Sequence, residues 1–374
     1  MKRMKVMTIL GTRPEIIRLS RIIALCDECF EHKLVHTGQN YDYRLGGIFL
    51  EELGIRKPDY YLDCAGDNLG QTIGRIIERS YEVLLKERPD AVLILGDTNS
   101  SLSAIAAGRL HIPIFHLEAG NRCWDMYVSE MENRRILDCI SDINLCYTEQ
   151  ARLQLLKEGK DPKTVFVVGS PMQEVLSFYR ERIEKSDVLN RLELRKGEYL
   201  LASVHREENV DDPDAFENIF AAIEEAAAYQ KLPVLLSTHP RTKRWIEERG
   251  LSFSKNIIPM PPFGFFDYCC LERNSRAVLS DSGTLSEESM MLSFPAILLR
   301  TSTERPEAFD AGGMLLGGVT PEEVLRALDV LEKTKYKELT KPESYTVKDV
   351  SSKVVRIIES YTKVVNLTTW RKNR

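Results

Sequence analysis

Residues 280–288 read Ser280-Asp281-Ser282-Gly283-Thr284-Leu285-Ser286-Glu287-Glu288 and follow an apolar segment at 277–279 that is typical of a buried strand. Small residues at a strand-to-helix turn leave backbone N–H groups exposed at the positive end of the helix dipole, where proteins hold phosphate. Ser282 and Gly283 would then take a pyrophosphate, and an acid in the first helical turn would reach the two ribose hydroxyls. The segment therefore predicts a nucleoside diphosphate site. The alternative is a helix that is only capped, by Thr284 and Glu287.

Size and composition narrow the class of protein. The chain has 374 residues, more than one hydrophobic core usually organises, so two domains are expected. Hydrophobic residues make up 43% and charged residues 29%, as in soluble globular proteins. A net charge of -5, without clustered basic and aromatic residues, argues against nucleic acid as a partner. The N-terminus lacks the apolar core of a signal peptide and no apolar run reaches membrane-spanning length, which predicts a cytoplasmic protein without a membrane partner.

Short apolar runs alternate with helical patterns along the whole chain, which indicates parallel α/β layering. The pattern predicts two doubly wound domains: residues 1–170, with a C-terminal helix at about 350–374 packing back on them, and residues 171–349 as the nucleotide-binding domain. In such sheets the ligand lies beyond the carboxyl ends of the strands, so the expected site is a cleft between two facing domains. Neither a Gly-x-Gly-x-x-Gly nor a Walker sequence occurs, which argues against a dinucleotide dehydrogenase and a P-loop NTPase.

Polar side chains follow the predicted strands of the first half. Arg13 comes after the strand at 5–10 and could neutralise a pyrophosphate. Asp97 follows the strand at 91–95, Glu118 follows the strand at 114–116, and Glu130 precedes another helix. Carboxylates crowded in a closing cleft raise each other's proton affinity, so some can act as bases and others as acids. This set suits removal and return of a proton on carbon, and the alternative is a group of solvated surface residues.

The second half repeats the arrangement. His205 follows the strand at 199–204, His239 follows the strand at 234–237, and Arg305 follows the strand at 296–299. A histidine at a strand end can carry a proton or donate to a phosphate or a sugar hydroxyl. Arg305 offers a second cation for a pyrophosphate or a sugar contact.

These clusters, in this order, resemble the non-hydrolysing UDP-N-acetylglucosamine 2-epimerase family over nearly the whole chain. The matching motifs are Gly-Thr-Arg-Pro-Glu at 11–15, His-Thr-Gly-Gln at 36–39, Gly-Asp-Thr at 96–98, Glu-Ala-Gly at 118–120, Asn-Arg at 133–134, His-Arg-Glu at 205–207, Ser-Asp-Ser-Gly at 280–283 and Glu-Arg-Pro-Glu at 304–307. The resemblance implies a GT-B-like fold of two Rossmann-like domains. It also implies inversion at C2 of a UDP-2-acetamido sugar without a redox cofactor or a metal, and a homodimer.

The resemblance also implies roles for particular residues. UDP leaves C1 while a carboxylate takes the C2 proton, and UDP adds back to the resulting 2-acetamidoglycal. Asp97, Glu118 and Glu130 match the family's acid and base carboxylates, with the order of proton transfer left open. Glu288 matches the ribose ligand. The charge of the departing UDP would be stabilised by a set that combines cations with the strand-to-helix turn, namely Arg13, His205, Ser282, Gly283 and Arg305.

Several residues depart from the family pattern and point to a branch. Arg18 stands where the family usually has Lys, and Met131 follows Glu130 in a motif that is more commonly Pro-Glu-Glu-x-Asn-Arg. Together with the motifs at 118–122 and 263–265, Arg18 resembles the branch that makes UDP-N-acetyl-L-fucosamine from UDP-2-acetamido-2,6-dideoxy-L-talose for capsules and O-antigens. The alternatives are the plain UDP-N-acetylglucosamine 2-epimerase, a GT-B glycosyltransferase and a UDP-sugar sensor.

Overall fold

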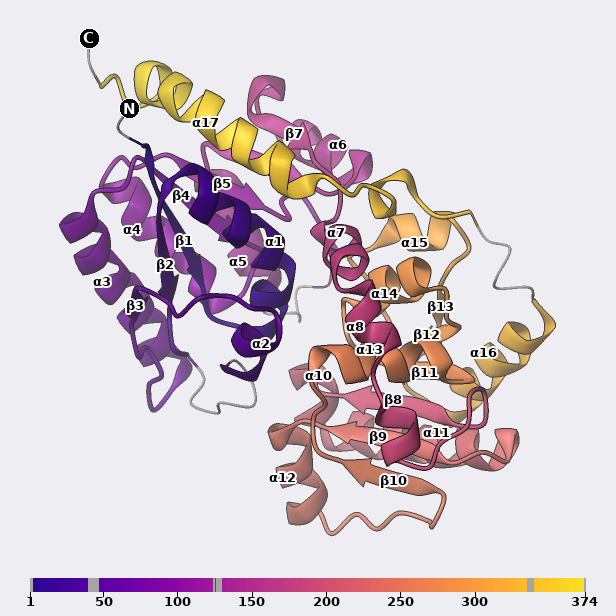
Figure 1. Cartoon of the computed structure of the whole chain (residues 1–374). Coiled ribbons are helices and arrows are strands. Elements are labelled where there is room, and N and C mark those ends of the chain that lie inside the picture. The colour runs from indigo at the N-terminus through magenta and orange to yellow at the C-terminus, as the bar shows by residue number, and fades with distance from the viewer. Residues whose placement is uncertain (1–2, 40–46, 124, 126–129, 335–339, 373–374) are drawn as a thin grey trace. The chain divides into compact units, whose positions relative to one another are not determined.

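The computed structural model describes residues 3–39, 47–123, 125, 130–334 and 340–372. The chain divides into two compact units (Figure 1). Unit 1 comprises Met1–Ser177 and Thr346–Arg374, and unit 2 comprises Phe178–Tyr345. Each unit is an α/β structure built on a parallel sheet, so the predicted fold class is confirmed.

Seven strands form the sheet of unit 1 within the described residues, in the order β3-β2-β1-β4-β5-β6-β7 and all parallel. The strands are β1 Lys5–Leu10, β2 Glu31–His36, β3 Tyr60–Tyr61, β4 Ala91–Leu95, β5 Ile114–Leu117, β6 Ile143–Cys146 and β7 Val165–Val167. The helical segments are α1 Arg13–Cys29, α2 Gly47–Glu52, α3 Leu69–Glu87, η2 Asn99–Leu102, α4 Ser103–Arg109, α5 Glu130–Ile140, α6 Glu149–Lys157, η3 Pro162–Thr164, α7 Pro171–Phe178 and α17 Val350–Thr368.

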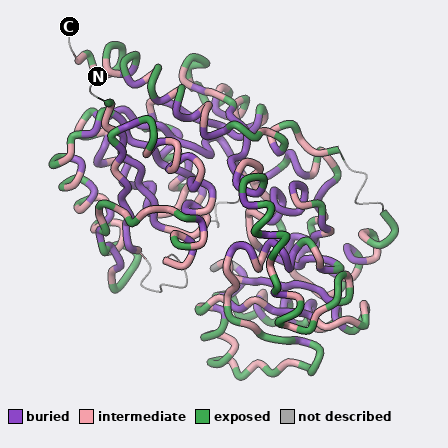
Figure 2. The backbone as a smooth tube through the Cα atoms, in the orientation of Figure 1, coloured by how far each residue is buried: buried purple, intermediate pink, exposed green. Residues whose placement is uncertain are grey.

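Burial explains why these segments became strands. All five residues of β4 are buried, as expected for a central parallel strand that is covered by helices on both faces (Figure 2).

The C-terminal helix α17 returns to unit 1 and packs against α1 (Figure 1). Its buried positions include Val354 and Ile358, which lie one helical turn apart on the same face.

Six strands form the sheet of unit 2 among the described residues, again parallel, in the order β10-β9-β8-β11-β12-β13. They are β8 Leu200–Val204, β9 Val234–Thr238, β10 Ile257–Met260, β11 Ala277–Ser280, β12 Ala296–Leu298 and β13 Leu315–Leu316. The helical segments are α8 Arg180–Glu184, α9 Val188–Arg191, α10 Glu207–Val210, α11 Pro213–Gln230, α12 Pro240–Glu248, α13 Phe265–Asn274, α14 Leu285–Leu292, α15 Pro306–Asp310, α16 Pro321–Lys333 and η5 Glu343–Tyr345.

Both sheets have the doubly wound order, in which the first strand of the unit lies between the second and the fourth. The strand order therefore reverses between β1 and β4 in unit 1, and between β8 and β11 in unit 2. Ligands of such sheets bind beyond the carboxyl ends of the strands at this reversal. The topology consequently directs attention to the loops that follow these four strands.

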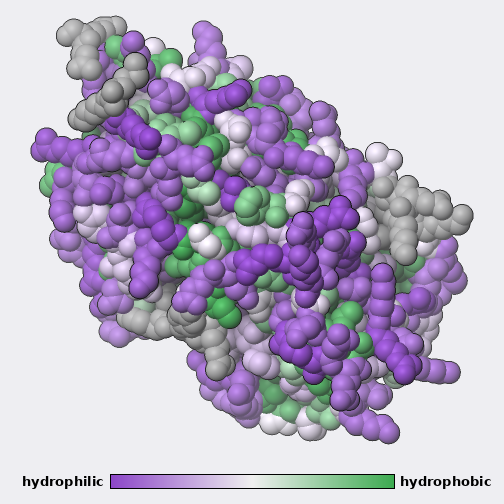
Figure 3. Space-filling view, viewed as in Figure 1, coloured by the Kyte–Doolittle hydropathy of each residue, from purple (hydrophilic) through white to green (hydrophobic). Residues whose placement is uncertain are grey.

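The structure contains local features that the sequence did not predict. The edge strands β3 and β13 were not predicted, because two residues each are too few to show a pattern. Helices α7 and α8 separate at Tyr179, next to the boundary between the units. Among the described residues, no helix is both long and apolar enough to cross a membrane. Hydrophilic side chains cover most of the face seen in Figure 3.

Candidate functional site

The carboxyl edge of the sheet in unit 1 gathers polar loops from neighbouring strands. β1, β4 and β5 are adjacent, and Leu95 of β4 pairs with Leu117 of β5. Asp97 therefore lies two residues beyond one strand, and Glu118 lies one residue beyond the next. Parallel strands end at the same edge of a sheet, so the two carboxylates follow the ends of two neighbouring strands.

The Glu15 side chain connects two of these loops by hydrogen bonds. Its Oε2 accepts from the backbone N–H groups of Gly11 (2.9 Å) and Thr12 (2.7 Å), in the loop after β1. Its Oε1 accepts from the hydroxyls of Ser100 (2.5 Å) and Thr98 (3.1 Å), after β4. Burial raises the pKa of Glu15, while these hydrogen bonds oppose the shift. The reversal point of the sheet is thus held by a buried side chain that sequence reasoning did not single out.

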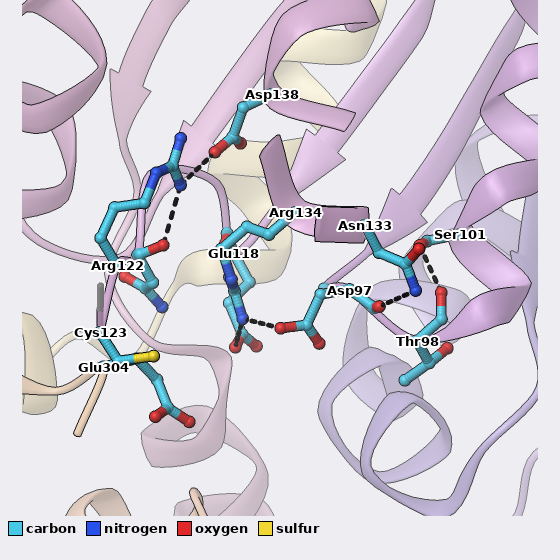
Figure 4. A network of polar contacts seen from close by, with 12 residues as sticks. Asp97, Thr98, Ser101, Glu118, Arg122, Cys123, Asn133, Arg134, Asp138 and Glu304 are labelled. Carbon is cyan, nitrogen blue, oxygen red and sulfur yellow. Dashed lines mark hydrogen bonds and ion pairs between the residues drawn. The ribbon is translucent and has the colours of Figure 1, made fainter. Parts of the chain in front are cut away.

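Arg134 joins the two candidate carboxylates. Its Nη2 contacts Asp97 Oδ2 and lies 3.3 Å from Glu118 Oε1, and its Nη1 donates to the backbone oxygen of Glu118 at 2.6 Å (Figure 4). Arg18 Nη1 donates to Glu118 Oε2 from α1. A guanidinium at this range stabilises the ionised form of a carboxylate. The expected crowding of acids is therefore compensated by cations.

Helix α5 supplies this guanidinium together with the third predicted acid. Glu130 is the first residue of the helix and lies one turn before Arg134, on the same face. Asn133 Nδ2 donates to the backbone oxygen of Asp97 (2.9 Å) and to Asn99 Oδ1 (3.1 Å). The Asn-Arg motif thus fixes the loop after β4, and Glu130 begins the helix that carries it.

Glu118 has an unusual backbone conformation. Its φ is +71°, in the left-handed region that residues with a side chain rarely adopt. The N–H donates to the oxygen of Leu145 (3.0 Å), and the oxygen accepts from Arg134. Strained residues of this kind persist where their surroundings hold them, often at functional sites.

A second buried group supports the same loop. Asp138 of α5 accepts from the backbone N–H of Gly120 with both oxygens (3.2 Å each), contacts His116 Nδ1 (3.0 Å) and pairs with Arg122 Nη1 (2.6 Å). Burial alone would raise the pKa of Asp138, but the hydrogen bond and charge of His116 and the nearby guanidinium groups outweigh it, so the pKa is lowered. The segment after β5 is therefore anchored on both sides of Glu118.

The two predicted arginines of α1 have different surroundings. Arg13, at the first position of the helix, holds its guanidinium carbon 5.7 Å from the ring centroid of Phe49 in α2. Arg18 is 4% exposed and lies 5.8 Å from the ring of Tyr147, besides its bond to Glu118. Arg18 is therefore one of the side chains that contact the candidate carboxylate Glu118.

In unit 2, Asp281 connects the two strands at the reversal. Its fully buried carboxylate accepts from the backbone N–H groups of His205 (3.1 Å to each oxygen) and Arg206 (3.0 Å), and from Asn209 Nδ2 (3.1 Å). His205 Nδ1 lies 3.2 Å from Asp281 Oδ1. His239, the N-cap of α12, has its ring centroid 6.3 Å from that of His205. The predicted histidines are therefore brought together, and Asp281 orients one of them.

Gly283 allows a close approach after β11. A Cβ on this residue would lie 2.7 Å from Glu304 Oε1 and 3.2 Å from Arg206 Nη2. Glu304 in turn pairs with Arg206 (3.4 Å) and Arg300 (2.9 Å). The hydroxyl of Ser282 lies 3.0 Å from that of Thr284. The turn is compact and rich in hydrogen-bonding groups, as a phosphate site requires.

The alternative of a helix capped by Thr284 and Glu287 does not hold for α14. Thr284 occupies the N-cap position, but its side chain makes no cap hydrogen bond and donates instead to Glu288 Oε2 at 2.9 Å. Glu287 is fully buried and lies 3.4 Å from Arg305 Nη2. Glu287 therefore forms a buried ion pair. Glu288, which is 9% exposed, is the acid of the first helical turn that remains next to residues 282–284.

Arg305 belongs to a buried polar cluster. It is 2% exposed, and its partner Glu287 lies near Glu307, whose Oε1 accepts from the hydroxyl of Tyr345 at 2.8 Å. Burial raises the pKa of Glu307, partly offset by the charge of Arg305 and the Tyr345 hydroxyl. The Nη2 atom of Arg305 thus lies beside a buried carboxylate of the same unit.

Each unit therefore carries one polar cluster at its reversal point. Unit 1 holds Asp97 and Glu118 against Arg18 and Arg134, which suits acid–base chemistry. Unit 2 presents a strand-to-helix turn with histidines, which suits binding of an anion. Sequence reasoning assigned no role to Arg134 or Asp281, although both stood inside quoted motifs; the spacing of Arg134 four residues after Glu130 was a usable signal.

Comparisons with known proteins identify the family of this chain. The family model described as UDP-N-acetylglucosamine 2-epimerase matches residues 25–359. A UDP-2,3-diacetamido-2,3-dideoxy-D-glucuronate 2-epimerase of Pseudomonas aeruginosa is 37% identical over 329 residues, covering 87% of this chain and 91% of that protein.

Two solved structures are similar over nearly their whole length. The UDP-N-acetylglucosamine 2-epimerase from Rickettsia bellii is 43% identical, with a TM-score of 0.91 that covers 99% of this chain and 100% of that chain. The Methanocaldococcus jannaschii UDP-GlcNAc 2-epimerase, in complex with UDP-GlcNAc and UDP, is 34% identical, with a TM-score of 0.90 over 95% and 99% of the two chains. The names of these relatives include more than one sugar, so the matches identify the family and leave the branch open. The chain belongs to the UDP-N-acetylglucosamine 2-epimerase family and is an enzyme of the isomerase class.

Proposed function

We propose that this enzyme inverts C2 of a UDP-2-acetamido sugar by eliminating UDP and adding it back. The observation that carries the proposal is the pair of carboxylates, Asp97 and Glu118, joined by a buried guanidinium at the carboxyl edge of the sheet in unit 1. Such a pair can exchange a proton with carbon while its charge stays compensated.

The chemistry requires a base and a stabilised leaving group. The C2 hydrogen of an acetamido sugar is not adjacent to a carbonyl, so direct removal is prohibitive. When a carboxylate takes the proton, the C2–H electron pair forms the C1–C2 double bond, and the C1–O pair leaves with UDP. UDP then adds to C1 of the 2-acetamidoglycal while an acid protonates C2 from the opposite face. We assign the proton transfers to Asp97, Glu118 and Glu130.

Unit 2 would hold the UDP group. Ser282 and Gly283 lie at the amino end of α14, where the helix dipole and backbone N–H groups favour a pyrophosphate. Glu288 would bind the ribose, and His205 would stabilise the leaving group. Arg13, His239 and Arg305 are further candidates for the phosphate charge, and Arg305 would have to share its guanidinium with Glu287.

The preferred substrate is UDP-2-acetamido-2,6-dideoxy-L-talose, giving UDP-N-acetyl-L-fucosamine for capsule or O-antigen synthesis. Arg18 and the motifs at 118–122 and 263–265 support this choice. Arg18 contacts Glu118, so the arginine that departs from the usual lysine lies in the carboxylate network. The second candidate is conversion of UDP-N-acetylglucosamine to UDP-N-acetylmannosamine, which the 43% identity to the Rickettsia bellii protein supports.

Deuterium exchange tests both candidates at once. The protein is incubated in deuterated water, separately with UDP-N-acetyl-L-fucosamine and with UDP-N-acetylglucosamine, and C2 deuterium and configuration are followed by NMR. Exchange and inversion confined to the fucosamine compound support the preferred substrate, and exchange only with the glucosamine compound supports the alternative. Asp97→Asn should abolish exchange, whereas Glu132→Gln, an exposed acid on α5, should not. No exchange with either compound would refute the epimerase proposal for both substrates.

A further inference from the structure

We propose that Arg134 is a positioning residue that keeps Asp97 and Glu118 ionised and fixed relative to each other. This inference rests on the proposed function, because it concerns the carboxylates that would move the proton. Arg134 itself need not touch the sugar.

The contacts of Arg134 connect three separate segments. Its side chain, 3% exposed, extends from α5 to Asp97 in the loop after β4 and to Glu118 after β5. It also donates to the backbone oxygen of Glu118, the residue with a φ of +71°. One planar guanidinium therefore contacts both carboxyl groups and the strained backbone of Glu118. A side chain that only neutralised charge would not need the third contact.

Arg134 compensates negative charge in this cluster. Among the described residues, Arg18 contacts Glu118, and Arg134 contacts both Glu118 and Asp97, whose side chains are 5% and 20% exposed. Without Arg134, both carboxylates would lose a guanidinium that lies beside them. Like charges in a poorly solvated site disfavour each other's ionised form, so at least one carboxyl would hold its proton to higher pH. A protonated carboxyl cannot take the C2 hydrogen.

Neighbouring charges do not replace Arg134. Arg122 is committed to Asp138 (2.6 Å) and to Glu158 (2.7 Å), and His116 contacts Asp138 (3.0 Å) and the oxygen of Gly96 (2.9 Å). On α5 itself, Glu130 is a further acid on the same face as Arg134, which adds negative charge. These groups increase the need for the second guanidinium.

Three variants separate charge from geometry. Arg134→Met removes the positive charge and the planar guanidinium. Arg134→Lys keeps the charge but loses the planar group that can contact two carboxylates at once. Arg135→Met, the control, changes the neighbouring exposed arginine. We expect Arg134→Met to lower kcat by about a hundredfold or more, as displaced catalytic groups do, and to move the acid limb of the kcat/KM profile upward by about one pH unit or more. Arg134→Lys should lose roughly tenfold in kcat with the limb unmoved, and KM should stay within about threefold in both. Arg135→Met should match the wild type.

A second measurement does not depend on turnover. Carboxyl ¹³C NMR of protein labelled in Asp and Glu, assigned with Asp97→Asn and Glu118→Gln, follows the titration of both groups. An upward-shifted titration in Arg134→Met supports the inference even if no tested sugar is turned over. Unshifted titrations, or a wild-type acid limb and kcat in Arg134→Met, would overturn it. Absence of exchange in the wild type would instead count against the proposed function.

Discussion

Replacing Tyr345 by Phe removes one hydroxyl from the buried cluster of unit 2. Tyr345 is fully buried, and its hydroxyl donates to Glu307 Oε1 at 2.8 Å. The ring remains, so the packing changes by one oxygen atom. Glu307 is 5% exposed and loses a donor that water cannot readily replace. The effect therefore isolates one buried hydrogen bond to a carboxyl group.

The magnitude depends on the ionisation of Glu307. A hydrogen bond to a charged group contributes about 1.5–3 kcal/mol net, and one between neutral groups about 1 kcal/mol. Burial raises the pKa of Glu307 above its ordinary value of 4.5, so the stability that this group contributes is present below that value and is lost as pH rises through the folded-state pKa. Without the Tyr345 donor the carboxylate is harder to form. We expect a loss in the free energy of unfolding of about 1–3 kcal/mol, larger near pH 8 than near pH 5 because the ionised fraction of Glu307 rises with pH.

The assay is hydrogen exchange read by mass spectrometry, combined with guanidinium denaturation at both pH values. The loss of protection should appear in peptides that cover α15 and η5, which carry Glu307 and Tyr345, because hydrogen exchange reports the stability of each segment separately. Tyr229→Phe is the matched control: the same atom is removed in the same unit, but from an exposed side chain whose hydroxyl lies 3.5 Å from Asp329. A Tyr345→Phe loss no larger than that of the control, or a larger loss at low pH, would refute the reasoning.

Three further outcomes are expected. Gly283→Ala would bring a Cβ within 2.7 Å of Glu304 Oε1, and we expect about tenfold weaker UDP binding by calorimetry, with unchanged binding counting against a nucleotide at this turn. Gly313→Ala would bring a Cβ within 1.7 Å of Met290 Sδ, and urea denaturation should show a loss of about 1–3 kcal/mol from overpacking; a stable variant would mean that the methionine moves freely. Because the pKa of Asp138 is lowered, this group stabilises the fold at pH values above the ordinary carboxyl pKa, and the stabilisation is lost as pH falls through the folded-state pKa. Asp138→Asn should therefore flatten the acid side of the curve of unfolding free energy against pH. An unchanged slope would contradict this.

The sequence predicted the elements closely where the local pattern is strong. β1 and β4 have the predicted bounds, because each is a largely apolar run that is followed directly by a glycine. It also predicted that Asp97, Glu118 and the turn at 280–288 lie at strand ends, because the boundary of a buried strand is a local property. It did not predict the two-residue edge strands, which have no periodicity of their own.

By itself, the sequence determined the two parallel α/β units and the edge at which polar side chains collect, since alternating strand and helix patterns allow few other layers. Only the tertiary structure decided the partners. Arg134 reaches acids 37 and 16 residues away, and Glu287 pairs with Arg305 instead of capping α14 with Thr284. Such pairings follow from the strand order, which brings β4 beside β5 and β11 beside β12. No local pattern encodes that order, because it arises from packing of the whole sheet.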